Sequence, residues 1–344
     1  MNDNYFQKLN RCYMVAEIGV NHNGNVLLAK EMIKQAKIAG ADAVKFQTFN
    51  AERLVSQGTP KVSYQINHTD PSESHFEMIK RLELSRNDHL ILYENCKDLG
   101  IDFISTPYDI ESAQFLVNLG IKILKTASAD IVDLPLHQFI ASTKIPTMIA
   151  TGMSSLGEVE DVVDIYSNAA HKDIVLLHCV SNYPCSAQSL NMRAMSTLGS
   201  AFDLPIGYSD HSQGHIASVL AIALNAKVIE KHFTIDRSLS GPDQAASSTP
   251  NEFNYLVHSI RDAEKMLGEK RKKAQMEELG MADVSRKSIC LSREINAGET
   301  IRLSDLTLMR PGTGLQANLI TYVLGKKARQ SLKAGHFLSL NEIE

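Results

Sequence analysis

The chain has 344 residues, of which 44% are apolar and 22% are charged, and its formal net charge is −4. These values are typical of a globular protein and exclude a disordered or collagen-like chain. The mild acidity offers no basic face for nucleic acid, and no apolar run reaches the ~18 residues of a membrane span. The five scattered cysteines lack a CxxC pair, and the N-terminus lacks a signal peptide's apolar segment. We therefore expect reduced thiols in a cytoplasmic protein.

Short apolar runs alternate with segments of helical period along the first 267 residues. The runs are typical of strands buried on both faces, and residues 25–40 carry the apolar stripe of a helix. Eight such units are the number in a (β/α)8 TIM barrel, whereas a doubly wound sheet needs a Gly-rich nucleotide turn that is missing here. We therefore predict a TIM barrel with strands within residues 12–21, 43–49, 102–109, 123–130, 147–153, 174–184, 205–212 and 228–234.

One predicted connection is unusually long. About fifty residues separate the second strand from the third, and the polar stretch 51–75 within them has weak periodicity. Loops of that length in a compact enzyme are usually functional. We interpret this stretch as part of the rim of a substrate site.

The composition changes towards the C-terminus. Residues 268–285 form a charged stretch without predicted strands. Segments 295–312 and 332–344 form an internal near-repeat, because both contain the same Ala-Gly pattern. Residues 286–344 carry nine Lys or Arg and five Asp or Glu, a net charge of +4, which leaves −8 for residues 1–285. We predict a catalytic barrel at 1–267, a linker at 268–285 and a small β-rich domain at 286–344. That domain should dock by charge complementarity onto the barrel or onto a second copy.

Two lysines within the apolar runs point to an anion. Active sites of TIM barrels lie at the carboxyl ends of the strands, and almost every predicted strand here ends in polar residues. Lys45 and Lys125 lie inside such strands, where an unpaired ammonium would be costly. With Ser and Thr hydroxyls around them, they predict a site for a multiply charged anion such as phosphate. A Schiff-base lysine is the alternative, because burial lowers the pKa of lysine.

Two histidines end the last two predicted strands. His211 and His232 could share a divalent metal ion that acts as a Lewis acid on a carbonyl. The alternative is a pair of acid–base or hydrogen-bonded histidines.

Ordered motifs then give the chain a recognisable pattern: 17–24 (EIGVNHNG), 44–48 (VKFQT), 105–107 (STP), 151–153 (TGM), 178–184 (HCVSNYP), 209–211 (SDH), 230–234 (EKHFT) and 241–243 (GPD). Together they resemble the sialic acid synthase (N-acetylneuraminate synthase) family. The resemblance covers the whole chain, since residues 309–312 (MRPG) and the Ala-Gly repeats are similar to that family's C-terminal antifreeze-like SAF domain.

The resemblance implies a reaction. Phosphoenolpyruvate would condense with an N-acylated hexosamine and water, which gives a nonulosonic acid and phosphate by C–O cleavage. The acceptor would be N-acetylmannosamine, or a diacetamido hexose in the legionaminic and pseudaminic acid branches. The resemblance also implies a divalent metal ion, Mn²⁺ or Mg²⁺, and a domain-swapped homodimer.

The resemblance further implies roles for individual residues. Glu17 matches the carboxylate that handles the attacking water, and the metal ligands match His211 and His232. Sugar contacts match Gln47, Asp243 and, from the partner's small domain, Arg310. Contacts to phosphoenolpyruvate match Lys45, Thr106, Lys125, Ser128, Ser181, Tyr183 and Ser209.

The chain departs from the family pattern at two places. Ala150 stands where Ser is common, which removes one hydroxyl near the phosphate. Residues 127–130 read Ala-Ser-Ala-Asp rather than Gly-Ser-Gly-Glu, which leaves the acceptor open. Two other functions remain as alternatives: a Schiff-base aldolase acting on 2-keto sugar acids, and an inert barrel that carries a module for binding ice or polysaccharide.

Overall fold

The computed structural model describes residues 4–62, 65–66, 69–70 and 72–344. The chain divides into two compact units, Met1–Gly268 and Glu269–Glu344. Among the described residues, no helix combines the length and the apolar character needed to cross a membrane.

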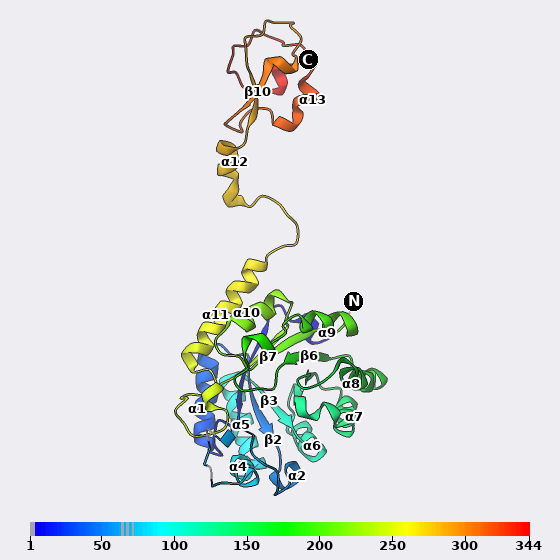
Figure 1. Ribbon diagram of the computed structural model, residues 1–344, viewed down its shortest axis with the longest axis vertical. Helices are drawn as coiled ribbons and strands as arrows, with labels where there is room; N and C mark the ends of the chain where they lie inside the picture. The colour runs from blue at the N-terminus through cyan, green and yellow to red at the C-terminus, as the bar shows by residue number, and fades with distance from the viewer. Residues whose placement is uncertain (1–3, 63–64, 67–68, 71) are drawn as a thin grey trace. The chain divides into compact units, whose positions relative to one another are not determined.

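The strands of the first unit form a closed parallel barrel in chain order, which confirms the predicted TIM-barrel fold (Figure 1). Each strand falls within one of the eight predicted runs. The runs 123–130 and 174–184 are longer than their strands, because their polar ends turn into the loops that follow. The strands are β1 (Tyr13–Gly19), β2 (Ala43–Thr48), β3 (Asp102–Pro107), β4 (Leu124–Thr126), β5 (Thr147–Ala150), β6 (Ile174–Cys179), β7 (Ile206–Asp210) and β8 (Val228–His232).

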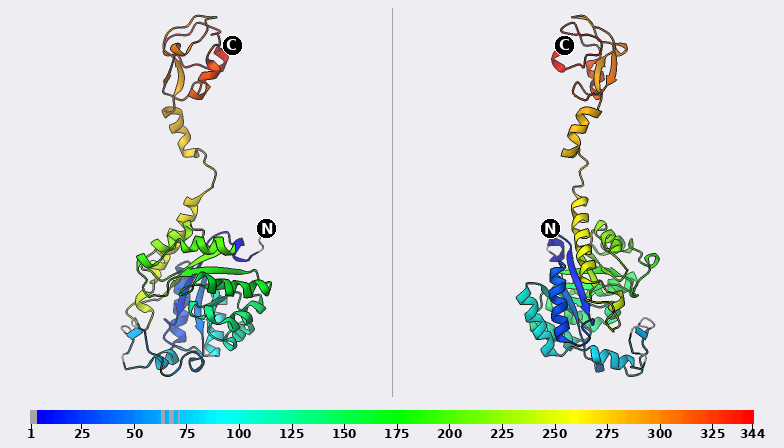
Figure 2. Two further views of the ribbon diagram at one scale, coloured as in Figure 1. Left: turned by 45° about the vertical axis from the view of Figure 1, so that its right-hand side comes forward. Right: turned by 90° about the vertical axis from the view of Figure 1, so that its left-hand side faces the viewer.

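Helices surround the barrel in both views of Figure 2. In α1, Asn25 caps the N-terminus by accepting from the backbone of Leu27 and Leu28, and the buried stripe includes Met32 and Ile33. The helices that follow the strands are α1 (Val26–Ile38), α5 (Arg86–Leu99), α6 (Ile110–Leu119), α7 (Leu134–Thr143), α8 (Leu156–Asn168), α9 (Ala194–Phe202), α10 (Ile216–Ala223) and α11 (Pro250–Leu267).

One end of the barrel is closed by the N-terminal segment. Phe6, in the short helix η1 (Phe6–Lys8), is fully buried in a cluster that includes Val15, Met148 and Val175 from the barrel interior. Figure 1 shows the N-terminus at this end, and the arrow of β2 points away from it. The strands therefore present their carboxyl ends at the open end.

Among its described residues, the long connection after β2 contributes the helices α2 (Ala51–Leu54) and α4 (His75–Leu82) at that open end (Figure 1). Five residues of the predicted rim segment 51–75 lie outside the described residues. In the rest of the connection, Phe49, Met78 and Leu82 form a small apolar core with Val20 of the barrel.

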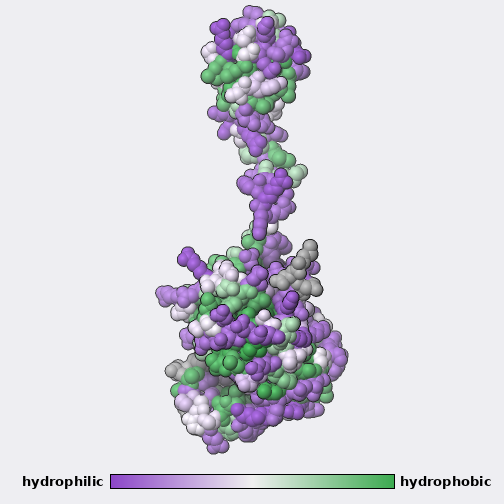
Figure 3. All heavy atoms as spheres, turned by 90° about the vertical axis from the view of Figure 1, so that its right-hand side faces the viewer, coloured by the Kyte–Doolittle hydropathy of each residue, from purple (hydrophilic) through white to green (hydrophobic). Residues whose placement is uncertain are grey.

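The C-terminal unit has its own core, which includes Ile289, Ile301 and Leu338. Its regular elements are α12 (Leu279–Ser285), the antiparallel pair β9 (Ser288–Leu291) and β10 (Leu306–Met309), and α13 (Ile320–Val323). The two predicted repeat copies are bridged where Ile295 pairs with Leu332. Apolar side chains also lie on the surface of this unit (Figure 3).

Candidate active site

A pocket of about 450 Å³ lies at the carboxyl ends of the strands, and every barrel strand contributes to it. Of the predicted site residues, only Arg310 lies elsewhere: it follows β10 in the C-terminal unit and is exposed there. Its expected contact with the sugar stays a prediction. The pocket brings together Glu17, Lys45, Gln47, Thr106, Lys125, Ser128, Ser181, Tyr183, Ser209, His211, His232 and Asp243.

The floor of the pocket is a cluster of buried charges. Lys45 Nζ lies 2.8 Å from Glu17 Oε2 and donates to Thr106 Oγ1 at 3.1 Å. Lys125 Nζ lies 3.4 Å from Glu230 Oε1, which also accepts from Ser209 Oγ at 2.9 Å. Each lysine is thus paired with a carboxylate in an interior where an unpaired charge would be costly.

The carboxylates of this cluster differ in how easily they take up a proton. Burial raises the pKa of Glu17 to about 7, although Lys45 opposes the shift. Burial also acts to raise the pKa of Glu230, but Lys125 and Lys45 outweigh it and hold that pKa below its usual range. Glu17 is therefore the carboxylate poised to exchange a proton near neutral pH.

A bulge in β1 aims Glu17 at the cluster. Glu17 is the register partner of Lys45, whereas Phe46 pairs with Gly19, so one residue of β1 is extra. Gly19 has φ of +54°, and a Cβ there would lie 3.0 Å from Glu17 Oε1. The glycine permits the local twist that bulges commonly introduce beside active sites.

A second group of polar atoms lies beside Lys125. The backbone nitrogen of Gly152 donates to Ser128 Oγ at 3.0 Å, and Ser128 Oγ lies 3.0 Å from Cys179 Sγ. A Cβ on Gly152 would lie 2.6 Å from Ser181 Oγ and 2.8 Å from Ser128 Oγ. Hydroxyl donors thus converge on a space that even a methyl group would fill, which suits a phosphate oxygen. The neighbouring Ala150 contributes no hydroxyl.

His211 and His232 face each other across the pocket, with ring centroids 5.5 Å apart. His211 Nδ1 bonds the carbonyl of Val180 at 2.8 Å, and its Nε2 lies 3.4 Å from Ser209 Oγ in the pocket. The buried Nδ1 of His232 has no hydrogen-bond partner among the described residues. Tyr183 packs against both rings. Burial lowers the pKa of both imidazoles and favours the neutral form that metal binding requires.

The histidine pair fits a divalent ion as a site with two protein ligands. In the described part of the chain, no three His, Cys, Asp or Glu side chains are grouped to hold a metal. Asp243, whose pKa burial raises to about 6, has its Oδ2 3.9 Å from His232 Nδ1. An ion held by His211 and His232 would therefore keep most of its coordination positions for water and substrate, as a catalytic ion does.

One wall of the pocket is apolar. Phe49 and Leu54 line it, as do Met78 and Ile79 of α4 and Tyr108 after β3. The polar floor and this wall face the same space. A ligand that fills the pocket therefore needs anionic or polar groups at one end and apolar groups at the other.

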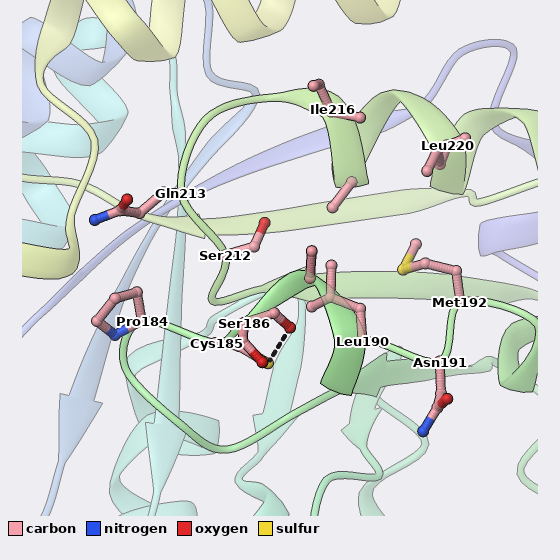
Figure 4. A pocket seen from close by; sticks show the side chains of 12 residues that line it. Pro184, Cys185, Ser186, Leu190, Asn191, Met192, Ser212, Gln213, Ile216 and Leu220 are labelled. Atoms are coloured by element: carbon pink, nitrogen blue, oxygen red, sulfur yellow. Dashed lines mark hydrogen bonds between the residues drawn. The ribbon is translucent and has the colours of Figure 1, made fainter.

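A second hollow, of about 600 Å³, lies between the loop that follows β6 and the segment formed by the loop after β7 and the start of α10 (Figure 4). Its lining includes Leu190, Met192, Ile216 and Leu220, and no Lys, Arg, Asp, Glu or His contributes to it. It therefore lacks the groups for acid–base or anion chemistry, and the floor of the barrel pocket is the candidate active site.

Sequence reasoning missed Glu230 and the apolar wall. Glu230 lies two residues before His232 in the same strand, and side chains two residues apart lie on the same face of a strand. This two-residue alternation could have identified Glu230 as a pocket residue. The wall comes from three separate segments that meet only in the folded chain.

The NeuB family model matches residues 32–272, and the SAF domain model matches residues 286–344. N,N'-diacetyllegionaminic acid synthase of Legionella pneumophila is 47% identical over 337 residues, which cover 97% of this chain and 95% of that protein. The N,N'-diacetyllegionaminic acid synthase of Campylobacter jejuni is 40% identical over 94% of this chain and 98% of its own. Pseudaminic acid synthase of Helicobacter pylori is 32% identical over 96% of this chain and 97% of its own.

Among solved structures, the chain is similar to the N-acetylneuraminic acid synthetase of Leptospira borgpetersenii, crystallised with citrate. The two share 34% identity with a TM-score of 0.72, over 79% of this chain and 90% of the other. These matches confirm the resemblance found in the motifs. The chain belongs to the NeuB family and carries a C-terminal SAF domain.

Proposed function

We propose that this protein condenses phosphoenolpyruvate with an N-acylated hexosamine and water to form a nonulosonic acid and phosphate. The observation that carries the proposal is the paired Lys45–Glu17 and Lys125–Glu230 cluster beside the hydroxyl cradle at Gly152. Two ammonium groups and converging hydroxyls match a small trianion, and the family relationship supports the same chemistry.

The residues of the floor supply the steps. The enol carbon of phosphoenolpyruvate bonds to the aldehyde carbon of the sugar, whose oxygen becomes a hydroxyl, and positive charge develops at C2 of phosphoenolpyruvate. Glu17 accepts one proton from a water molecule as the oxygen of that water bonds to C2, and this proton completes the new hydroxyl on the former aldehyde carbon. The resulting tetrahedral centre breaks its C–O bond to phosphate, the second water proton leaves with the phosphate, and the water oxygen becomes the ketone oxygen. Lys45 and Lys125 stabilise the anionic groups throughout.

The histidine pair would hold Mn²⁺ or Mg²⁺, and such an ion supplies polarisation of the sugar carbonyl. His211 and His232 orient that end of the acceptor towards the floor. Tyr183 packs on both rings and limits their rotation.

For the acceptor, we favour a diacetamido deoxyhexose over N-acetylmannosamine. The apolar wall of Phe49, Leu54 and Ile79 suits a methyl group and a second acetamido methyl better than a row of hydroxyls. The two relatives at 47% and 40% identity carry the name diacetyllegionaminic acid synthase. Gln47, which donates to Glu17 at 3.4 Å, and Asp243 face the space where the sugar would lie.

An assay of phosphate release tests the function directly. The purified chain, Mn²⁺ and phosphoenolpyruvate are combined with N-acetylmannosamine or with 2,4-diacetamido hexoses of different configuration. We expect phosphate release only with a sugar present, and a higher kcat/KM for a diacetamido sugar. Release that ignores the sugar would contradict the condensation.

The Schiff-base aldolase predicts a different outcome. Burial acts to lower the pKa of Lys45, but Glu17 and Glu230 hold it above its usual range, whereas an imine requires a neutral amine. Borohydride treatment with substrate should leave no lysine adduct detectable by mass spectrometry. A stable adduct on Lys45 or Lys125 would favour the aldolase.

We further propose a homodimer in which Arg310 of the partner subunit contacts the sugar. Support comes from the charges, +4 on residues 286–344 and −8 on the rest, and from exposed apolar side chains on the C-terminal unit, including Leu303, Tyr322 and Leu340. The fixed fork of a guanidinium suits sugar hydroxyls and an acyl carbonyl.

Subunit exchange tests this arrangement. Arg310→Ala and Lys125→Met proteins, each inactive alone, should regain part of the activity after mixing, because a mixed dimer has one intact site. Arg329→Ala, which removes an exposed arginine of the same unit, is the matched control and should stay active. Proven exchange without recovery would contradict a site shared between chains.

A further inference from the structure

A buried ion pair lies directly behind the two histidines. Asp210 of β7 and Lys231 of β8 are register partners, and Lys231 Nζ lies 2.9 Å from Asp210 Oδ2. Their side chains are 0% and 4% exposed, respectively. Neither residue lines the pocket, whereas Ser209, His211, Glu230 and His232 do. Alternation along the strands therefore directs the pair away from the pocket and towards the helices.

Both carboxylate oxygens of Asp210 and the ammonium group of Lys231 have hydrogen-bond partners. Asp210 Oδ1 accepts from both the backbone nitrogen and the hydroxyl of Ser212, at 2.9 and 2.7 Å. Asp210 Oδ2 accepts from Ser218 Oγ of α10 at 2.6 Å, and Lys231 Nζ donates to the carbonyl of Ser212 at 2.7 Å. A buried ionic network with all members satisfied rigidifies the backbone that it connects.

That backbone is the one that carries the histidines. His211 lies between Asp210 and Ser212, so its neighbours on both sides belong to the network, and His232 directly follows Lys231. The carbonyl of His211 is held in addition by the backbone nitrogen of Cys185 at 2.8 Å. Figure 4 shows Ser212 on the loop that leads from β7 to α10, across from Cys185. The network thus fixes the position of one imidazole relative to the other.

We propose that Asp210 and Lys231 are positioning residues that set the spacing of His211 and His232 for a shared divalent ion. The inference rests on the proposed metal-assisted function and deepens it. A buried ion pair is weak support for stability, because apolar replacements are often equally stable. The pair instead fixes geometry, because it connects the ends of β7 and β8, and the residue after each member of the pair is one of the two histidines.

The test measures metal binding without turnover. Mn²⁺ alone is titrated into the full chain, and free Mn²⁺ is followed by electron paramagnetic resonance, with the thermal midpoint measured for each variant. The variants are Lys231→Met, Asp210→Asn, the double variant, and the milder Ser218→Ala. Arg261→Met is the matched control, because Arg261 also forms a largely buried pair, with Asp42 at 3.3 Å, remote from the histidines.

We expect both single variants to bind Mn²⁺ about 10–100-fold more weakly, as for other residues that orient metal ligands. The Mn²⁺ affinity of Ser218→Ala should lie between that of the single variants and that of the wild type. The double variant should regain thermal stability, since no unpaired charge remains, and yet bind Mn²⁺ weakly. Arg261→Met should lose stability and keep its Mn²⁺ affinity.

Two results would overturn the inference. Recovery of Mn²⁺ affinity together with stability in the double variant would assign the pair a structural role alone. A wild-type chain that binds no Mn²⁺ would remove the metal site itself. Failure of the proposed condensation would be seen separately, as no phosphate release from a chain that still binds Mn²⁺ with the predicted order of affinities.

Discussion

Lys45 Nζ and Glu17 Oε2 lie 2.8 Å apart with both side chains almost fully buried. The two residues are register partners on adjacent strands, so the barrel itself places the ammonium and the carboxylate together. The pair joins the anion-binding part of the floor to the group that exchanges a proton.

Lys45→Met should therefore weaken phosphoenolpyruvate binding. A charge-assisted hydrogen bond contributes about 1.5–3 kcal/mol, which corresponds to a roughly 10–100-fold higher Kd in calorimetry. Lys37→Met, which removes an exposed lysine that donates to the carbonyl of Gly100, is the matched control and should leave the Kd unchanged. Equal Kd values for the two variants would remove Lys45 from the anion site.

Gly152→Ala tests the hydroxyl cradle. The added Cβ would lie 2.6 Å from Ser181 Oγ, 2.8 Å from Ser128 Oγ and 2.9 Å from Cys179 Sγ, so these groups must move out of their converging positions. We expect KM for phosphoenolpyruvate to rise about tenfold or more, the effect of losing one or two good hydrogen bonds. Gly157→Ala, with nothing within 4 Å of the new Cβ, should retain the wild-type KM. A wild-type KM for Gly152→Ala would place the phosphate elsewhere.

Ile79→Asn tests the apolar wall as the element that selects the acceptor. A polar side chain there should penalise the methyl-bearing sugar and favour one with more hydroxyls. We expect the ratio of kcat/KM for a diacetamido sugar over N-acetylmannosamine to fall about tenfold, the scale of one apolar group in a pocket. Leu90→Asn on α5, an exposed position, is the control. A ratio that does not change would separate the wall from acceptor choice.

Asp130 gives a prediction for stability against pH. Burial raises the pKa of Asp130 to about 7, with Asp133 adding to the shift, and the buried Oδ2 has no hydrogen-bond partner among the described residues. The folded protein therefore keeps a proton that the unfolded chain releases near pH 4, and stability falls as pH rises from there to about 7.

Asp130→Asn should remove that loss. Relative to the wild type, the free energy of unfolding of Asp130→Asn should be unchanged below pH 4 and higher by about 1 kcal/mol above pH 7. This value is smaller than the full pKa shift implies, because the side chain is partly exposed and solvent screens its charge. Asp164→Asn at an exposed site of α8 should change the thermal midpoint little at either pH. A gain of equal size at pH 4 and pH 8 would show that the charge of Asp130 is not the cause.

Apolar periodicity predicted the eight strands because each one is buried on both faces and reads as a short continuous run. It overextended β4, since the polar end of the predicted run, Ser128 to Asp130, already belongs to the 3-10 helix Ser128–Val132 that follows the strand. Polar strand ends located the pocket, because parallel strands bring their carboxyl ends to one edge.

The ionic contacts of the site could not be predicted in the same way. Lys125 and Glu230 are 105 residues apart, and their contact depends on the closure of the barrel. The pair Asp210–Lys231 follows from the register of β7 and β8, which periodicity along a single strand does not determine. Arg310 lies in a separate unit, so its contact with the sugar stays a prediction.

We expect phosphate to leave by C–O cleavage after condensation with a sugar. The most direct measurement uses phosphoenolpyruvate with heavy oxygen at the bridging position, the purified chain, Mn²⁺ and a 2,4-diacetamido hexose, and follows both products by mass spectrometry. We expect labelled phosphate and an unlabelled sugar acid that contains the three carbons of phosphoenolpyruvate. Unlabelled phosphate, with the heavy oxygen retained in the sugar acid, would show attack at phosphorus and contradict the role proposed for Glu17.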